Sequence, residues 1–189
     1  MRPPSLIETA LIVIETERLA LRELVADDAA FMLELLNEPA FLRHIGDKGV
    51  RDLKDARDYI AKGPGASYRQ RGYGLYRVGL RAGDAAVGIC GLVKREALDD
   101  PDLGFAFLAR YRSQGYASEA AAAVLDHGRS VLKLDRIVAI TTPENRASRA
   151  VLEKVGLRIE GMIRLTERDP ELILFGPSRV RSTARAVRR

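Results

Sequence analysis

The segment best suited to chemistry in this chain lies just before an alanine-rich stretch. Residues 112 to 118 read RSQGYAS and precede EAAAAVLDHG, which predicts a helix. The first turn of a helix has unpaired main-chain N–H groups and a partial positive charge, which together bind anions. Gly115 and Ala117 let a ligand approach the main chain closely, and Arg112 adds a charge that pairs with phosphate oxygens. The segment is therefore predicted to bind an anionic group.

A simpler interpretation is that Ser118 caps the helix and Gly115 only permits a turn. That interpretation explains these two residues, but it does not explain why Arg112 and Gln114 accompany them. Two familiar phosphate-binding loops are excluded. The segment has no lysine in the P-loop pattern, and no G-x-G-x-x-G motif follows the first predicted strand.

Other reactive residue types offer little. Cys90 is the one cysteine of the chain, so it forms no internal disulfide, which favours a reducing, cytoplasmic compartment. It lies within AVGICGLV and is interpreted as a small core residue, not a nucleophile. Neither His44 nor His127 has metal-ligating neighbours at a useful spacing. No metal site is predicted.

Hydrophobic periodicity predicts the elements that position the 112–118 segment. Their order is a strand, two helices, three strands, a helix, a strand, a helix and two strands. The two early helices fall within residues 25–39 and 50–65, the next covers 118–132, and the last covers 146–155. This order predicts one α/β domain: a mixed, mostly antiparallel sheet with helices on both faces.

The domain is expected to span residues 15–176, after an uncertain N-terminal segment of residues 1–14. The net charge of +5 comes from 31 basic and 26 acidic residues. Five arginines match this excess: Arg179, Arg181, Arg185, Arg188 and Arg189. Residues 177–189 are therefore predicted to form a basic, disordered tail, with weak RNA binding as the less favoured alternative. No apolar run is long enough to predict a membrane span.

Several stretches resemble the GNAT N-acetyltransferase superfamily. RSQGYA matches its [QR]-x-x-G-x-[GA] signature. DLGFAFLARYRSQGYASEAAAAVLDHG is similar to the family's fourth strand and third helix, and RIVAITTPENRASRAVLEKVGLRIEG to the elements that follow. TERLALREL and GICGLVKR resemble the branch of ribosomal-protein-alanine N-acetyltransferases. The resemblance covers about residues 15–175 and implies a GNAT-like fold with acetyl-CoA as co-substrate.

The resemblance also implies roles for individual residues. Main-chain N–H groups hold the pyrophosphate of acetyl-CoA, and they belong to Gln114, Gly115, Tyr116, Ala117 and Ser118. Arg112 frames this loop. The fourth strand splays from the fifth, and the main chain of Phe107 and Leu108 contacts the pantetheine and the thioester carbonyl. Asn145 contacts the cofactor arm, although its other interpretation is a simple cap for the helix 146–155.

The implied reaction is direct attack of an amine on the acetyl thioester, which needs a proton acceptor and a donor to the leaving thiolate. The family's usual tyrosine donor is replaced here by Leu152. Ser148 is the candidate donor, although a serine in a first helical turn often bonds only to nearby main chain. Glu167 is the first candidate base, and Asp102 and Glu96 are the others.

The acceptor amine stays open between a protein N-terminus, a free amino acid and a small amine. Residues 37–72 are expected to select it. A non-catalytic acyl-CoA-binding or sensor domain is the alternative function, and a homodimer is compatible with the sequence. The sequence predicts no membrane partner and no nucleic-acid partner beyond the basic tail.

Overall fold

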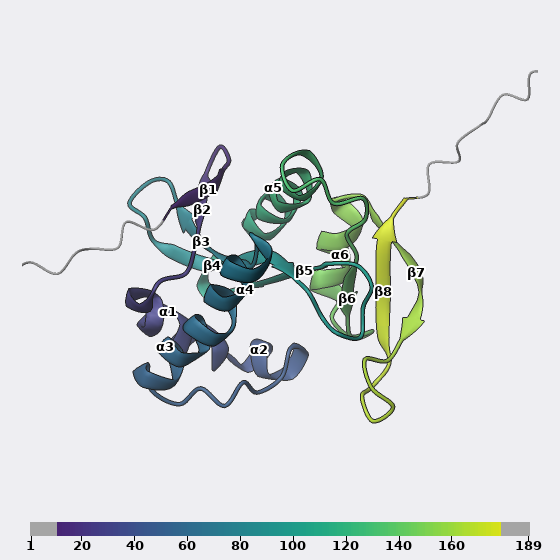
Figure 1. Cartoon of the computed structure of the whole chain (residues 1–189), viewed down its shortest axis with the longest axis horizontal. Helices are drawn as coiled ribbons and strands as arrows, with labels where there is room; N and C mark the ends of the chain where they lie inside the picture. The colour runs from purple at the N-terminus through teal and green to yellow at the C-terminus, as the bar shows by residue number, and fades with distance from the viewer. Residues whose placement is uncertain (1–10, 179–189) are drawn as a thin grey trace, which may run out of the picture.

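The computed structural model describes residues 11–178, which form two sheets with helices around them (Figure 1). The strands are β1 (Ile12–Glu15), β2 (Leu19–Arg22), β3 (Leu75–Leu80), β4 (Ala86–Val93), β5 (Asp102–Phe107), β6 (Ala139–Thr141), β7 (Leu157–Ile163) and β8 (Leu172–Pro177). The helices are α1 (Ala29–Leu36), α2 (Pro39–His44), α3 (Leu53–Lys62), α4 (Pro64–Arg71), α5 (Tyr116–Ser130) and α6 (Arg146–Lys154), with short 3-10 helices at Ala26–Asp28 and Ala109–Tyr111.

The two sheets meet at a single point along β5. One sheet has the antiparallel order β1-β2-β3-β4-β5, and the other has the antiparallel order β6-β8-β7. Among the described residues, the bridge between them is a parallel pair of Asp102 and Val138. Leu103 donates its N–H group to the Val138 carbonyl at 2.8 Å, and Val138 donates to the Pro101 carbonyl at 3.0 Å. Beyond this bridge β5 and β6 pair no further, so the sheet opens there.

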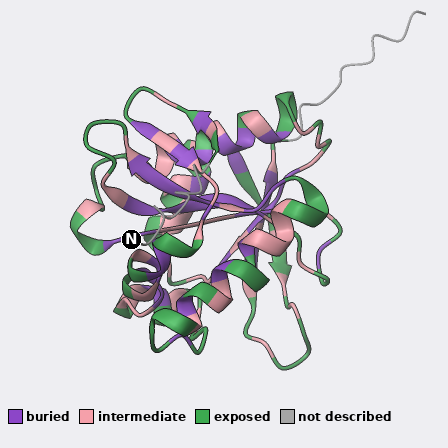
Figure 2. Ribbon diagram, turned by 60° about the vertical axis from the view of Figure 1, so that its left-hand side comes forward, coloured by how far each residue is buried: buried purple, intermediate pink, exposed green. Residues whose placement is uncertain are grey.

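Helices cover both faces of the larger sheet, as the sequence predicted. On one face, Val124 and Leu125 of α5 pack in a core with Cys90 and Leu92 of β4. On the other face, helices α1 to α3 build a second core that includes Met32. Figure 2 shows the buried residues concentrated in the strands between these layers. The mixed, mostly antiparallel α/β architecture is confirmed.

The early helical region differs from the prediction because it contains four helices instead of two. Pro39 begins α2 and does not merely end the helix before it, and Pro64 begins α4. Proline suits a first helical position because the N–H group it lacks has no partner within the helix there. Gly63 separates α3 from α4 and does not end the helical region.

Smaller differences affect the ends of elements. The helix predicted at residues 118–132 runs from Tyr116 to Ser130, so Val131 follows its last turn and is 62% exposed. β1 begins within residues 1–14, the N-terminal segment that the sequence left uncertain, and ends at Glu15. Residues 179–189, most of the predicted basic tail, lie outside the described residues. Within residues 11–178, no helix has the length and hydrophobicity needed to cross a membrane.

Candidate active site

A cavity of about 1000 Å³ follows β5 where the two sheets part. The turn before α5 and the first turn of α6 both contribute to its wall. The α2–α3 region and the loop between β7 and β8 line it from two further directions. All six residues of β5 line it, and successive residues of a strand are separated by about 3.4 Å, so the cavity is long enough for an extended ligand.

The entrance of α5 has the features expected of an anion site. Gly115 precedes the helix in the left-handed conformation (φ 84°), and no side chain caps this end. Among the described residues, the main-chain N–H groups of positions 114–118 have no hydrogen-bond partner. Ser118 is the third residue of the helix, so the interpretation of Ser118 as its cap is wrong. The glycine places a row of free donors at the cavity, where Gly115, Tyr116, Ala117 and Ser118 line the wall. Gln114 does not line it.

Arg112 braces this turn against the end of β5. Its Nε donates to the Phe107 carbonyl at 2.9 Å, and its guanidinium forms an ion pair with Glu38. The side chain is 40% exposed, and Arg112 itself lines the cavity. Much of its hydrogen-bonding capacity is therefore used to shape the turn, which fits the framing role expected from the sequence.

Arg18 is a second brace, and the sequence reasoning missed it. Its NH1 group donates to the Gln114 carbonyl at 3.1 Å, and its Nε donates to Glu119 at 2.7 Å. The guanidinium carbon lies 4.7 Å from the centre of the Tyr116 ring. A Cβ at Gly115 would come within 3.3 Å of the Arg18 NH2 group. The residues that Arg18 contacts are about 100 positions away in the sequence, so no local sequence pattern predicts these contacts.

The open edge of β5 offers main-chain groups to a ligand. Leu103 bonds to Val138 across this edge, and successive residues of a strand direct their main-chain groups to alternate edges. Phe105 and Phe107 therefore face the gap between the sheets. Leu108 does not, because its N–H group donates to the Val87 carbonyl at 3.0 Å and its side chain is buried. The expectation for Leu108 is corrected on this point, and Phe105 offers free groups instead.

The first turn of α6 brings two predicted residues to the opposite wall. Asn145 caps the helix, since its side-chain oxygen accepts the Ser148 N–H group at 3.1 Å. The Ser148 hydroxyl has no hydrogen-bond partner among the described residues, so the local bond considered above is not made. Leu152 is buried one turn further along. The Thr142 hydroxyl, which the sequence did not single out, is buried without a partner beside the same cavity.

The far end of β5 carries a buried carboxylate. Asp102 is 1% exposed, receives the Arg95 Nε–H group at 2.6 Å and accepts the Ile140 N–H group at 3.2 Å. Burial raises the pKa of Asp102 to about 6, and the contacts with Arg95 and Ile140 partly oppose this shift. Asp102 therefore holds the two sheets together at the bridge and lines the cavity as well.

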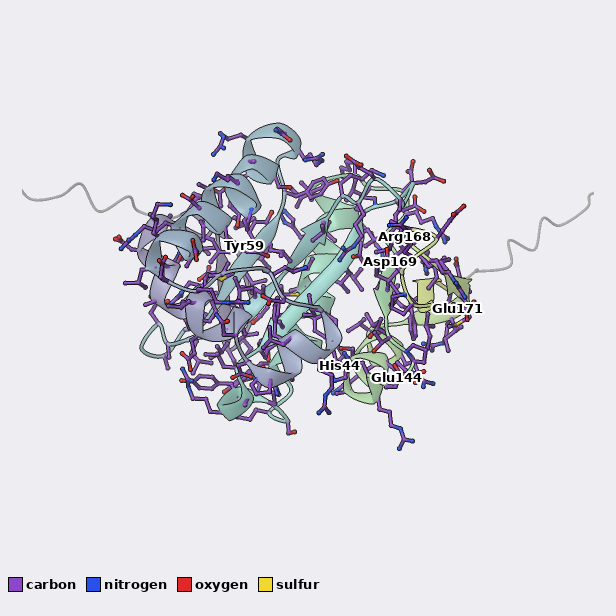
Figure 3. All side chains as sticks on the ribbon, turned by 90° about the horizontal axis from the view of Figure 1, so that it is seen from below. His44, Tyr59, Glu144, Arg168, Asp169 and Glu171 are labelled. Carbon is purple, nitrogen blue, oxygen red and sulfur yellow. The ribbon has the colours of Figure 1, made fainter. Side chains whose placement is uncertain are left out.

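The other candidate bases differ in position. Glu167 and Glu96 are exposed and do not line the cavity. Asp169, two residues after Glu167 in the β7–β8 loop, does line it. Figure 3 shows Asp169 on the side of β8 and Tyr59 on the side of the α1–α3 helices. The sequence singled out a loop that does reach the cavity, but side-chain direction within a loop has no sequence period to reveal it.

The remaining reactive side chains form no separate site. Cys90 is fully buried, and burial raises the pKa of its thiol, which leaves it a core residue. His44 lines the cavity at the end of α2. Within residues 11–178, no group of three or more His, Cys, Asp or Glu side chains is arranged to hold a metal ion.

Comparison with known proteins agrees with this geometry. Residues 18–158 match the family model of the acetyltransferase (GNAT) domain, so the chain belongs to the GNAT acetyltransferase family. It is 32% identical over 151 residues to the uncharacterized N-acetyltransferase YnaD of Bacillus subtilis, covering 80% of this chain and 85% of YnaD.

Solved structures extend the comparison to the fold. A GNAT-family acetyltransferase from Bacillus anthracis has a TM-score of 0.72 and 29% identity, over 86% of this chain and 96% of that one. The ribosomal L7/L12 α-N-protein acetyltransferase RimL has a TM-score of 0.74 and 16% identity, over 88% and 93% of the two chains. At that identity RimL shows the shared fold alone. The resemblance to the GNAT superfamily found in the sequence is confirmed by the family match.

Proposed function

We propose that this protein transfers an acetyl group from acetyl-CoA to a primary amine by direct attack of the amine. The observation that carries the proposal is the continuity of one cavity along β5. Free main-chain donors lie at one end, and an unpartnered serine hydroxyl and several titratable side chains line the rest. The acceptor is a small molecule or a protein N-terminus. The single, buried Cys90 supports a cytoplasmic location as part of this proposal.

Acetyl-CoA fits the residues that line the cavity. The N–H groups of residues 114–118 suit its pyrophosphate, because they are unpaired and lie at the positive end of a 15-residue helix. The main-chain groups of Phe105 and the N–H group of Phe107 suit the pantetheine arm, since they face the open edge of β5, whereas the Phe107 carbonyl is bonded to Arg112. The buried Thr142 hydroxyl has no partner, so a polar atom of the arm would satisfy it. When bound, acetyl-CoA supplies an activated thioester.

Residues of this chain then transfer protons and hold the amine in position. An α-amine has a pKa of about 7.7–8.0, so part of it is already neutral at physiological pH. A carboxylate on the cavity wall removes the remaining proton, with Asp169 and Asp102 on the wall and Glu167 outside it. Ser148 donates to the leaving sulfur, because it lines the cavity and no group within residues 11–178 uses its hydroxyl. Positioning of the amine along β5 supplies much of the acceleration.

The alternative is an acyl-CoA-binding domain without chemistry. One observation favours it: Leu152, at the family's usual tyrosine position, is buried and cannot donate a proton. Ser148 lies one helical turn earlier on the same wall, and its hydroxyl can donate the proton in place of a tyrosine.

Two measurements test the proposal. Calorimetry should detect coenzyme A binding, and a thiol-release assay with acetyl-CoA should respond to an acceptor amine from a panel of peptides, amino acids and polyamines. Binding without thiol release for any acceptor would favour the sensor alternative. Absence of binding at millimolar coenzyme A would overturn both.

The base is tested with two neighbouring variants. If Glu167 is the base, Glu167→Gln lowers the rate and moves the acidic limb of the pH–rate profile, while Asp169→Asn leaves both unchanged. If Asp169 acts, the pattern reverses. An unchanged rate and profile in Glu167→Gln removes Glu167 from the mechanism, and an unchanged Asp169→Asn as well leaves Asp102 as the remaining carboxylate on the wall.

A further inference from the structure

One wall of the cavity carries positive charge that the proposed chemistry does not use. Lys48, from the loop between α2 and α3, and Arg95, from the loop after β4, both line this wall together with Tyr59 of α3. Since β4 and β5 are antiparallel, Arg95 lies beside Asp102, at the end of β5 opposite the 112–118 turn. Five steps along β5 separate these ends by about 17 Å. The wall therefore belongs to the acceptor half of the cavity.

These side chains have unused hydrogen-bond donors. Among the described residues, Lys48 has no ion-pair or hydrogen-bond partner. Arg95 uses its Nε on Asp102, which leaves its two terminal nitrogens without partners in the same part of the chain. The Tyr59 hydroxyl also makes no hydrogen bond there. An ammonium, half a guanidinium and a phenol thus lie on the same wall, and no carboxylate of residues 11–178 pairs with these free donors.

The two cations are close enough to affect each other. Partial burial lowers the pKa of Lys48, and the Arg95 guanidinium lowers it further. Burial raises the pKa of Tyr59, and Arg95 opposes this shift, so the phenol also lies within the field of Arg95. Two like charges side by side repel, and an anion bound between them would relieve that repulsion.

The facing wall has the opposite sign. Asp169 comes from the β7–β8 loop and lines the cavity from the other side (Figure 3). Its carboxylate has no partner among the described residues. Asp102 binds Arg95, and Asp47 forms an ion pair with Arg51. Asp55 and Asp58 share a neighbouring groove with Lys48 and Tyr59, but Asp55 accepts the Arg51 N–H group and Asp58 pairs with Lys54 and Lys62. A molecule lying across the cavity therefore meets donors at one end and a free carboxylate at the other.

We propose that the acceptor is zwitterionic: its carboxylate binds Lys48, Arg95 and Tyr59, and its amine faces Asp169 and the open edge of β5. This inference rests on the acetyltransferase function proposed above and selects among its acceptors. A free amino acid supplies both groups, and so does a peptide N-terminus with an acidic residue close behind. A polyamine does not, because its second cation would lie against Lys48 and Arg95.

Matched acceptors test the carboxylate requirement. L-alanine is compared with L-alaninamide, and Ala-Glu-Ala-amide with Ala-Gln-Ala-amide, each with acetyl-CoA in a thiol-release assay. Spermidine is the cationic comparison. We expect kcat/KM for the carboxylate to exceed that for its amide at least tenfold in one pair. The pair that shows this distinguishes a free amino acid from an acidic peptide. Equal use of both members in both pairs, or a preference for spermidine, overturns the inference while the acetyltransferase function stands.

A variant of Lys48 tests whether the carboxylate requirement comes from this wall of the cavity. Lys48→Met keeps the length of the side chain and removes its charge, so KM for the preferred carboxylate acceptor should rise at least tenfold. KM for acetyl-CoA and kcat/KM for the matching amide should stay within twofold, and Lys48→Arg should restore most of the loss. Lys54→Met is the control, because Lys54 is 80% exposed and pairs with Asp58 outside the cavity. An equal loss on carboxylate and amide in Lys48→Met overturns the inference.

A binding experiment keeps the inference testable if no acceptor is acetylated. Each carboxylate acceptor is titrated calorimetrically into the protein saturated with coenzyme A. Binding that weakens at least tenfold in Lys48→Met, and not in Lys54→Met, supports the carboxylate site even though the acetyltransferase function has failed. Equal binding to both variants, or no binding to the unsubstituted protein, overturns it.

Discussion

Two helices begin at the same cavity, and they begin in different ways. The first turn of α6 is closed by a side chain, since Asn145 accepts the Ser148 N–H group. The first turn of α5 follows Gly115, has no side-chain cap and leaves its N–H groups free. A capped turn stabilises the helix, whereas an uncapped turn at a cavity keeps its donors for a ligand.

The braces around α5 replace the missing cap. Arg18 holds the Gln114 carbonyl and Glu119, and Arg112 holds the Phe107 carbonyl and Glu38. Each arginine bonds to a carbonyl or a carboxylate, and neither uses the helix N–H groups. The turn is therefore fixed in shape while its donors stay available. The α6 turn uses a donor for its own stability and contributes side chains to the cavity instead.

Equivalent positions of the two helices allow a direct test of this contrast. Ala117 and Ala147 are each the second residue of their helix, and both line the cavity. Ala117→Asp should weaken coenzyme A binding on the order of a thousandfold, because one carboxylate about 4 Å from one phosphate costs about 4 kcal/mol near a protein surface. Ala147→Asp should change binding only a few-fold. Calorimetry measures both.

The outcome separates ligand binding from helix stability. An acid in a first helical turn favours the helix dipole, so Ala117→Asp should not lower the melting temperature. Loss of binding together with loss of folded structure would not support the anion site. Equal losses of binding in the two aspartate variants would contradict the difference between the two turns.

The contrast continues along β5, where one end meets free donors and the other holds a buried carboxylate. The pKa of Asp102 is raised to about 6 by burial, against about 3.9 in an unfolded chain. Between these values the folded protein binds more protons than the unfolded one, so this group's contribution to stability is present below about pH 4 and lost as pH rises through 6. The full loss is about 3 kcal/mol.

Asp102→Asn removes this titration and keeps an oxygen for the Ile140 N–H group. Its free energy of unfolding should therefore rise relative to the unsubstituted protein by about 2 kcal/mol between pH 4.5 and 7.5, because about 1 kcal/mol of the full loss has already occurred below pH 4.5. Urea unfolding at both pH values measures the change. The test is how the difference in free energy of unfolding changes with pH. The lost contact with Arg95 shifts the free energy of unfolding of the variant at every pH, so a constant difference is not informative. Parallel stabilities across this range would show that Asp102 titrates normally.

Ser118 and Ser148 form a second matched pair, as each is the third residue of its helix. Ser148→Ala should lower kcat about tenfold and leave KM for acetyl-CoA unchanged, because only a proton donor to the leaving sulfur is lost. Ser118→Ala keeps the main-chain N–H group that is proposed to bind pyrophosphate, so both constants should stay within about twofold. Steady-state kinetics with the best acceptor measures this. A normal kcat in Ser148→Ala would assign proton donation elsewhere.

The sequence predicted the parts of this site that follow local rules. Helix periodicity and the small residues around Gly115 located the turn before α5 that lines the cavity. The start of α5 was misplaced by two residues, because Ser118 resembles an N-cap residue. The N-cap position is instead occupied by Gly115 in the left-handed conformation. The two additional early helices were missed because Pro39 and Gly63 read as stops, although each lies at the start of a new helix.

Contacts between distant segments could not be predicted in this way. The Arg18–Glu119 brace depends on how β2 and α5 pack, and nothing in either segment alone specifies it. The direction of Asp169 depends on the shape of one loop, and the charged wall at Lys48 and Arg95 joins two loops. Such features depend on the whole fold, so a single sequence contains no periodic signal for them.

The smallest expected effect concerns the cap of α6 and separates its two proposed roles. Asn145→Ala should lower stability by about 1 kcal/mol, or the melting temperature by about 2–4 °C, because Ser148 loses its hydrogen-bond acceptor. Asn145→Asp caps equally well and should keep the melting temperature. If Asn145 also contacts the cofactor arm through its amide nitrogen, Asn145→Asp raises KM for acetyl-CoA while remaining stable. Thermal unfolding and steady-state kinetics on the two variants decide this, and an unchanged KM in Asn145→Asp would leave Asn145 with the capping role alone.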